Sequence, residues 1–136
     1  MSTFKKFEDL EIWQLSRKLC NNIFEITEKG SFVKDFRFKD QIKSSSGSIM
    51  DNIAEGFGRG GNKEFVNFLS IALGSCSECS SQLYRAFDWK YISESEFKTN
   101  SQICEEIISK SGGLITYLKN SELRGTKFHK TTSDKH

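Results

Sequence analysis

The chain of 136 residues is 36% hydrophobic and 28% charged, which is typical of one folded domain with a modest core. Its net charge of +2 does not by itself indicate nucleic-acid binding, and no apolar run approaches the roughly 18–20 residues that a membrane span needs. The opening residues, MSTFKKFEDLEIW, contain no apolar stretch followed by a cleavage site, so they do not read as a signal peptide. We therefore expect a cytoplasmic protein whose four cysteines are reduced thiols.

The first two predicted helices follow from the spacing of apolar residues. The absence of proline, together with twelve phenylalanines, favours long uninterrupted helices. Leu10, Trp13 and Phe24 recur at helical spacing and predict a helix over about 9–29. A second stripe of this kind predicts a helix over about 35–56. Its residues are Phe38, Ile42, Ile49 and Ile53.

Basic and aromatic residues alternate in KDFRFKDQIK, at the start of the second predicted helix. This pattern can grip a nucleic-acid backbone, although Asp35 and Asp40 reduce its net charge to +2. The alternative is that the phenylalanines pack in the core while the charges are solvated. The candidate nucleic-acid contacts are the lysines near the C-terminus and five basic residues of this stretch and of the connection after the second predicted helix. The five are Arg37, Lys39, Lys43, Arg59 and Lys63.

A polar stripe runs along the second predicted helix, about 100° from the isoleucines. A solvated face would normally carry more lysine and glutamate, whereas these side chains are mostly small or uncharged. The stripe is therefore either ordinary polar surface or a hydrogen-bonded interface, within the bundle or between subunits. Its members are Gln41, Ser45, Ser48, Asn52, Glu55 and Arg59.

Four glycines fall within six residues in the stretch DNIAEGFGRGGNKEF. The spacing matches the G-x-G-x-x-G pattern of a dinucleotide-binding loop, but such a loop follows a buried strand, and the preceding segment here has helical period. The Walker pattern also fails, because Asn62 stands where a lysine is needed. We interpret Gly56 as the left-handed residue that ends the second helix. A minor alternative is an anion contact of Arg59 and Lys63 at the start of the next helix.

Two further helices are predicted over about 62–90 and 94–119. Ser93 and Glu96 have the S-x-x-E spacing of a capping box, which predicts the start of the last helix.

Four amphipathic helices with short connections are typical of an all-α, up-and-down four-helix bundle, which we place at residues 1–120. Gly112 and Gly113 interrupt the last helix and predict a kink or a close helix contact. Residues 121–136 are polar and basic, and we expect them to form a disordered tail.

Cys76 and Cys79 form a lone C-x-x-C in the middle of the third predicted helix. A zinc site needs four ligands, so Cys20 and Cys104 would have to converge from other helices. A thioredoxin-like motif would lie just after a strand. Small core-facing side chains are the simpler interpretation, and we expect no metal.

No arrangement of residues in the sequence indicates an enzyme. The only histidines, His129 and His136, lie near the C-terminus, and no pair of carboxylates stands out as an acid and a base. We therefore expect a non-enzymatic protein without a cofactor.

Three stretches together resemble a known family, the four-helix-bundle proteins encoded in intervening sequences of bacterial 23S rRNA genes. They are FEDLEIWQLS, DQIKSSSGSIMDNIAEGFGR and EFVNFLSIALGSCSEC, and the resemblance covers about residues 4–120. The combination of NIAEGFGR with a downstream IALGS is its most specific part. The resemblance implies a homopentamer of up-and-down bundles. Carried over by position, its signature residues are Gln41, Ser48, Asn52, Glu55, Gly56 and Arg59, which largely coincide with the polar stripe.

A related branch of this family is the accessory protein of diversity-generating retroelements. That protein is a basic pentameric barrel that binds nucleic acid and works with a reverse transcriptase. The present chain departs from the family pattern, because its bundle is nearly neutral and it has no proline. Two hypotheses follow: a homopentameric accessory or scaffold for RNA or DNA, or a protein-interaction module that docks a partner protein and has no nucleic-acid affinity.

Overall fold

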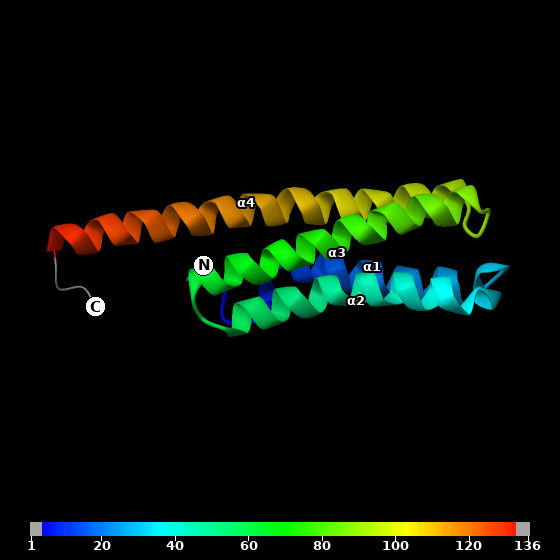
Figure 1. Ribbon diagram of the computed structural model, residues 1–136, viewed down its shortest axis with the longest axis horizontal. Helices are drawn as coiled ribbons and strands as arrows, with labels where there is room; N and C mark the ends of the chain where they lie inside the picture. The colour runs from blue at the N-terminus through cyan, green and yellow to red at the C-terminus, as the bar shows by residue number, and fades with distance from the viewer. Residues whose placement is uncertain (1–3, 133–136) are drawn as a thin grey trace.

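Four α-helices build the chain in the computed structural model, which describes residues 4–132 and their side chains through residue 121 (Figure 1). The described residues contain no strand, and none of their helices combines the length and apolar character needed to cross a membrane. In chain order the elements are η1 (Phe7–Asp9), α1 (Glu11–Thr27), η2 (Phe32–Lys34), α2 (Phe36–Gly58), α3 (Asn62–Asp88) and α4 (Glu94–Thr132).

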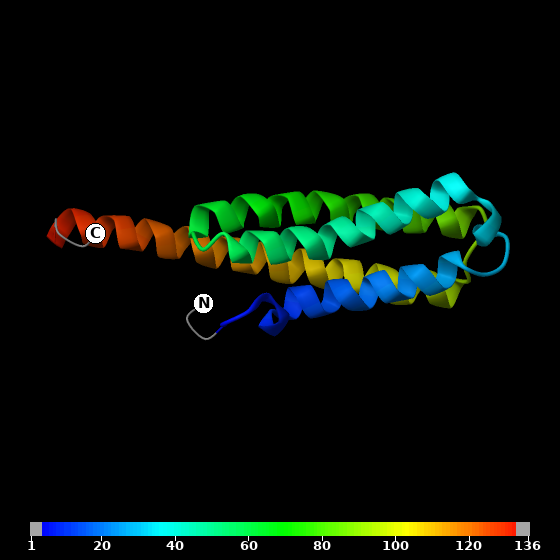
Figure 2. The same cartoon turned by 90° about the horizontal axis from the view of Figure 1, so that it is seen from below.

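Consecutive helices run in opposite directions, and α4 closes the bundle by packing against α1 (Figures 1 and 2). The predicted four-helix bundle is thereby confirmed. Two connections, residues 28–35 and 89–93, lie together at what we call the two-loop end. The third connection, residues 59–61, lies at the opposite, one-loop end. The core between the helices contains most of the predicted apolar residues, and Ile42, Ile49 and Ile53 are fully buried, whereas Phe24 of the first stripe is 57% exposed.

Gly56 does not end the second helix, which corrects the interpretation from the sequence. Helix α2 continues to Gly58, and the positive φ of 87° belongs to Gly60. Gly56 is buried within α2, where a Cβ atom would lie 2.6 Å from Cβ of Phe68 and 3.1 Å from Cδ1 of Phe65. The absence of a side chain there allows α2 and α3 to approach closely.

Helix α4 is longer than its apolar pattern predicts. Its backbone is helical to Thr132, so its last turns project beyond the one-loop end (Figures 1 and 2). Gly112 and Gly113 do not interrupt it, because buried Ser111 and Leu118 anchor the helix on either side. A Cβ atom at either glycine would meet no heavy atom within 4 Å, so the pair does not mark a close contact.

The expected disordered tail over residues 121–136 overlaps this extension. The backbone is helical through Thr132, and no proline stops the helix after Leu118. Residues 133–136 and the side chains after residue 121 lie outside the part of the chain that is described.

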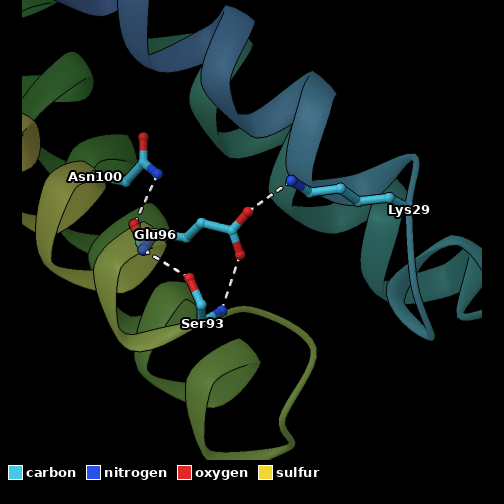
Figure 3. A network of polar contacts seen from close by, with 4 residues as sticks. All are labelled: Lys29, Ser93, Glu96 and Asn100. Carbon is cyan, nitrogen blue, oxygen red and sulfur yellow. Dashed lines mark hydrogen bonds and ion pairs between the residues drawn. The ribbon is translucent and has the colours of Figure 1, made fainter.

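The predicted capping box at the start of α4 forms as expected (Figure 3). The Glu96 amide donates to Ser93 Oγ at 3.1 Å, and the Ser93 amide donates to Glu96 Oε1 at 2.8 Å. The other Glu96 oxygen lies 2.8 Å from Lys29 Nζ, so the box also ties α4 to the loop after α1. Burial opposes ionisation of Glu96, but Lys29 and Ser93 outweigh it and lower its pKa.

The capping box makes stability depend on pH in the acidic range. A lowered folded pKa means that ionised Glu96 stabilises the bundle above the unfolded value of about 4.3, and that this contribution is lost as pH falls through the lower folded value. We expect Glu96→Gln to reduce the free energy of unfolding by about 1 kcal/mol near neutral pH and by less near pH ~3. Urea titrations at several pH values measure the difference.

The matched control for this prediction is Glu94→Gln. Glu94 pairs only with Lys98 in the described structure, and both side chains are about two-thirds exposed, at 67% and 71%. Its replacement should change stability by no more than about 0.5 kcal/mol at any pH. Parallel pH profiles for wild type and Glu96→Gln would contradict the role given to the carboxylate.

Candidate nucleic-acid interface

An aromatic cluster at the two-loop end joins the start of α2 to the loop after α3. Phe32 is fully buried, with its ring centroid 5.0 Å from Phe38 and 4.9 Å from Tyr91. Asp35 caps α2 by accepting the Phe38 amide at 3.1 Å, and its second oxygen accepts the Tyr91 hydroxyl at 2.8 Å. That bond, followed by burial, raises the pKa of Tyr91. The two loops are therefore held together through one carboxylate.

A hollow of about 340 Å³ lies beside this cluster. We call it the Trp89 hollow. The Arg85 guanidinium lies 4.2 Å from the Phe38 ring centroid and 5.4 Å from the Trp89 ring centroid. The Trp89 side chain is 51% exposed. The lining residues are Asp35, Arg37, Phe38, Gln41, Arg85 and Trp89.

The backbone turns after Trp89, the C-cap residue of α3. Lys90 adopts φ of 62°, a left-handed conformation that costs an ordinary residue roughly 1–2 kcal/mol. The turn brings the rings of Trp89 and Tyr91 to 6.0 Å from each other, in an edge-to-face arrangement. The Tyr91 amide donates to the Ala86 carbonyl at 2.8 Å and the Lys90 amide to the Phe87 carbonyl at 3.0 Å. These bonds make the turn at Lys90 a common C-terminal cap of a helix.

Two of the candidate lysines are paired within the chain. Lys39 and Lys43 reach the same oxygen of Glu28, at 3.1 and 2.9 Å. The hydrogen bonds from Lys43 and Lys39 lower the pKa of Glu28. Lys43 also lies over the ring of Phe24, with Nζ 4.8 Å from its centroid. One of their two positive charges is thus neutralised locally by Glu28.

Arg59 and Lys63 do not form one surface with these lysines. Arg59 and Lys63 lie at the one-loop end, so Arg37 and Arg59 stand about 33 Å apart along the helical rise of α2. Arg59 pairs with Glu55 at 2.7 Å. Within the described structure, Arg37 and Lys63 form no salt bridge. The predicted set is therefore divided between the two ends of the bundle.

The middle of the polar stripe is a hydrogen-bonded seam between α2 and α3. Ser45 donates to Gln82 Oε1 at 2.6 Å, and both side chains are buried. Ser75 donates to Ser48 Oγ at 2.9 Å. Asn52 donates to the Ser48 carbonyl at 2.8 Å, within its own helix. These groups satisfy one another inside a single bundle.

The ends of the polar stripe are exposed. Gln41 lies beside the Trp89 hollow, while Glu55 and Arg59 form their ion pair at the opposite end. Of the signature positions, Gly56 is the one where α2 and α3 approach closely. The signature residues therefore have three different roles: some belong to the hydrogen-bonded seam between α2 and α3, Gly56 allows these helices to approach closely, and the others lie on the exposed surface.

Arg85 and Trp89, which line the hollow, are not among the site residues predicted from the sequence. They lie in RAFDWKY, at the end of α3, where arginine and tryptophan are four residues apart and share a helix face. This stretch alternates basic and aromatic residues like KDFRFKDQIK, and the fold brings the two stretches together.

The cysteines lie within the bundle rather than at an open site. Cys76, Cys79 and Cys104 are fully buried, and Cys76 Sγ lies 3.5 Å from the Cys104 carbonyl oxygen. Cys20 donates to the Ser46 carbonyl at 3.1 Å, and burial raises its pKa to about 11, which keeps the thiol protonated at neutral pH. No three metal-binding side chains are grouped around a site in the described residues.

The comparisons with known proteins come from a family model and a solved structure. A model for the 23S rRNA-intervening sequence protein matches residues 8–113. A solved structure from Bacteroides thetaiotaomicron, described as a protein with unknown function from the S23 ribosomal protein family, is similar with a TM-score of 0.70. It is 23% identical, covering 76% of this chain and 97% of that one, a likeness that shows the fold alone. No curated protein matches the chain.

Proposed function

Because this chain belongs to the 23S rRNA-intervening sequence protein family, we propose that it is a cytoplasmic, non-enzymatic homopentamer that acts as an accessory or scaffold for RNA or DNA. The observation that carries the proposal is the Trp89 hollow, where Arg37 and Arg85 flank a half-exposed tryptophan. Among the described residues neither arginine is engaged in a salt bridge. Guanidinium groups beside an exposed aromatic ring are typical of surfaces that bind single-stranded nucleic acid.

Exposed apolar side chains on α3 and α4 support self-association. These two helices pack against each other, yet large side chains on both remain 36–58% exposed. At about 100° per residue these side chains lie on more than one face of the two helices, since Ile108 and Tyr117 are nine residues apart. Neighbouring copies of the chain on different sides of the bundle would remove them from water. These side chains are Ile71, Tyr84 and Phe87 on α3, and Ile108 and Tyr117 on α4.

A pentamer would compensate for the low charge of one protomer. The local excess of positive charge at the two-loop end is small, because Asp35 lines the hollow and Glu28 neutralises a lysine. Five copies of a weak contact act together once the first is made, which raises the apparent affinity without new contacts.

Light scattering on a size-exclusion column, with absorbance read for nucleic acid as well as protein, tests the proposal. We expect a particle of five chains of 15.6 kDa that binds single-stranded RNA. If each protomer neutralises one phosphate, the dissociation constant should rise about a hundredfold between about 50 and about 200 mM salt. A monomer would contradict the assembly. A pentamer with no nucleic-acid affinity at low salt would contradict the scaffold.

The second candidate function is a protein-interaction module. It is favoured by the ion pairs of Lys39, Lys43 and Arg59, which leave few cations free for phosphates. This function predicts an oligomer without nucleic-acid affinity at physiological salt, and a defined polypeptide that co-purifies with it. The same column separates the two functions.

A further inference from the structure

The Trp89 hollow has the size and lining of a site for a planar group. Its volume of about 340 Å³ lies at the lower end of the range for small-ligand pockets. The indole of Trp89, 51% exposed, and the guanidinium of Arg85, 5.4 Å from its centroid, both contribute to the lining. Nucleobases stack on aromatic rings and on guanidinium planes.

The charged and polar residues around the hollow indicate where the base and the phosphate of a nucleotide would lie. The charged residues of the lining are Asp35, Arg37 and Arg85, so a phosphate is disfavoured beside Asp35 and favoured beside the arginines. Arg37 is exposed and can meet a phosphate at the rim. The Gln41 amide carries a donor and an acceptor for the polar edge of a base. A neutral base inside the hollow, with its sugar–phosphate backbone outside, keeps the phosphate away from Asp35 and allows Gln41 to bind the base and Arg37 to bind the phosphate.

We propose that the Trp89 hollow binds one unpaired nucleobase of a single strand, stacked on Trp89, with a flanking phosphate at Arg37. The inference rests on the proposed function and narrows its ligand to single-stranded nucleic acid. A duplex does not fit, because its bases are already paired and stacked within the helix. Phe38 and Tyr91, whose ring centroids lie 5.6 and 6.0 Å from that of Trp89, orient the indole before binding, which reduces the cost of ordering it.

Tryptophan fluorescence reports on this contact directly, because the chain has two tryptophans. Trp13→Phe leaves Trp89 as the reporter. Trp13 lies in a different hollow on α1, with Arg17 5.8 Å from its ring, so it is also the matched Trp–Arg control. A short oligoadenylate RNA, alone or annealed to oligouridylate, is titrated against the full-length protein. We expect saturable quenching by the single strand and none by the duplex.

Variants at the hollow measure its contribution to affinity. Trp89→Leu should raise the dissociation constant for oligoadenylate about 5- to 100-fold, since each stacked base contributes strongly to binding. Arg37→Gln, at an exposed position, should raise it less and flatten its salt dependence. Trp13→Phe should leave the affinity unchanged. Circular dichroism and the urea midpoint establish that each variant is folded. If Trp89→Leu does not fold, Arg37→Gln still tests the site.

The outcomes separate this inference from the proposed function. Quenching by the single strand, together with weaker binding by Trp89→Leu, supports both. Salt-dependent binding without quenching, and with unchanged affinity in Trp89→Leu, overturns the base site and leaves the scaffold. Equal quenching by the duplex overturns the selection of unpaired bases. No binding by the wild-type protein at low salt overturns both.

Discussion

Replacing Gly56 with alanine is expected to lower the free energy of unfolding by about 1–3 kcal/mol, although alanine is the better helix former. The added Cβ atom would lie 2.6 Å from Cβ of Phe68 and 3.1 Å from a ring carbon of Phe65. Because Cβ of Phe68 is bonded directly to the backbone, it cannot swing away, and α3 must move as a whole. That displacement costs more than the gain of roughly 0.5–1 kcal/mol from helix propensity.

Gly47→Ala is the matched control, on the same helix two and a half turns earlier. A Cβ atom at Gly47 would meet no heavy atom within 4 Å, so we expect this change to stabilise the protein by about 0.5–1 kcal/mol. Urea unfolding followed by circular dichroism, at one protein concentration, measures both. If both variants are stabilised, the close approach of α2 and α3 at Gly56 does not constrain the bundle.

The sequence predicts the four helices well because each has a continuous apolar stripe. The capping box at Ser93 and Glu96 is equally local, and it forms as predicted. Gly56 shows what such reasoning lacks. The sequence alone does not distinguish a glycine within a helix from one that ends a helix. Here Gly56 is needed because Phe68 of α3 packs against it.

The candidate site was only partly predictable for the same reason. The basic stretch around Arg37 is visible in the sequence, but the pairing of Lys39 and Lys43 with Glu28 depends on how α1 packs against α2. Arg85 and Trp89 reach the surface beside Arg37 through the packing of α2 against α3. The chemistry of each stretch is local, whereas the surface they share is a property of the fold.

Asp35→Ala should have the second largest effect on stability, with a loss of about 2 kcal/mol. The carboxylate performs two tasks at once. One oxygen caps α2 through the Phe38 amide at 3.1 Å, and the other accepts the Tyr91 hydroxyl at 2.8 Å. Alanine removes both bonds and leaves the first amides of α2 without their cap. The free energy of unfolding in urea measures the loss.

Two further variants separate the two tasks of Asp35, and a third serves as a control. Asp35→Asn keeps a good capping residue and should recover most of the stability. Tyr91→Phe should reduce the free energy of unfolding by less than Asp35→Ala does. In the Asp35→Ala background it should cause little further loss, because the two side chains share one hydrogen bond. Asp40→Ala, at an exposed acidic position five residues later, should stay within about 0.5 kcal/mol of wild type. Strictly additive losses for Asp35→Ala and Tyr91→Phe would mean that this bond does not join the two loops, and the aromatic rings alone would then hold the two-loop end together.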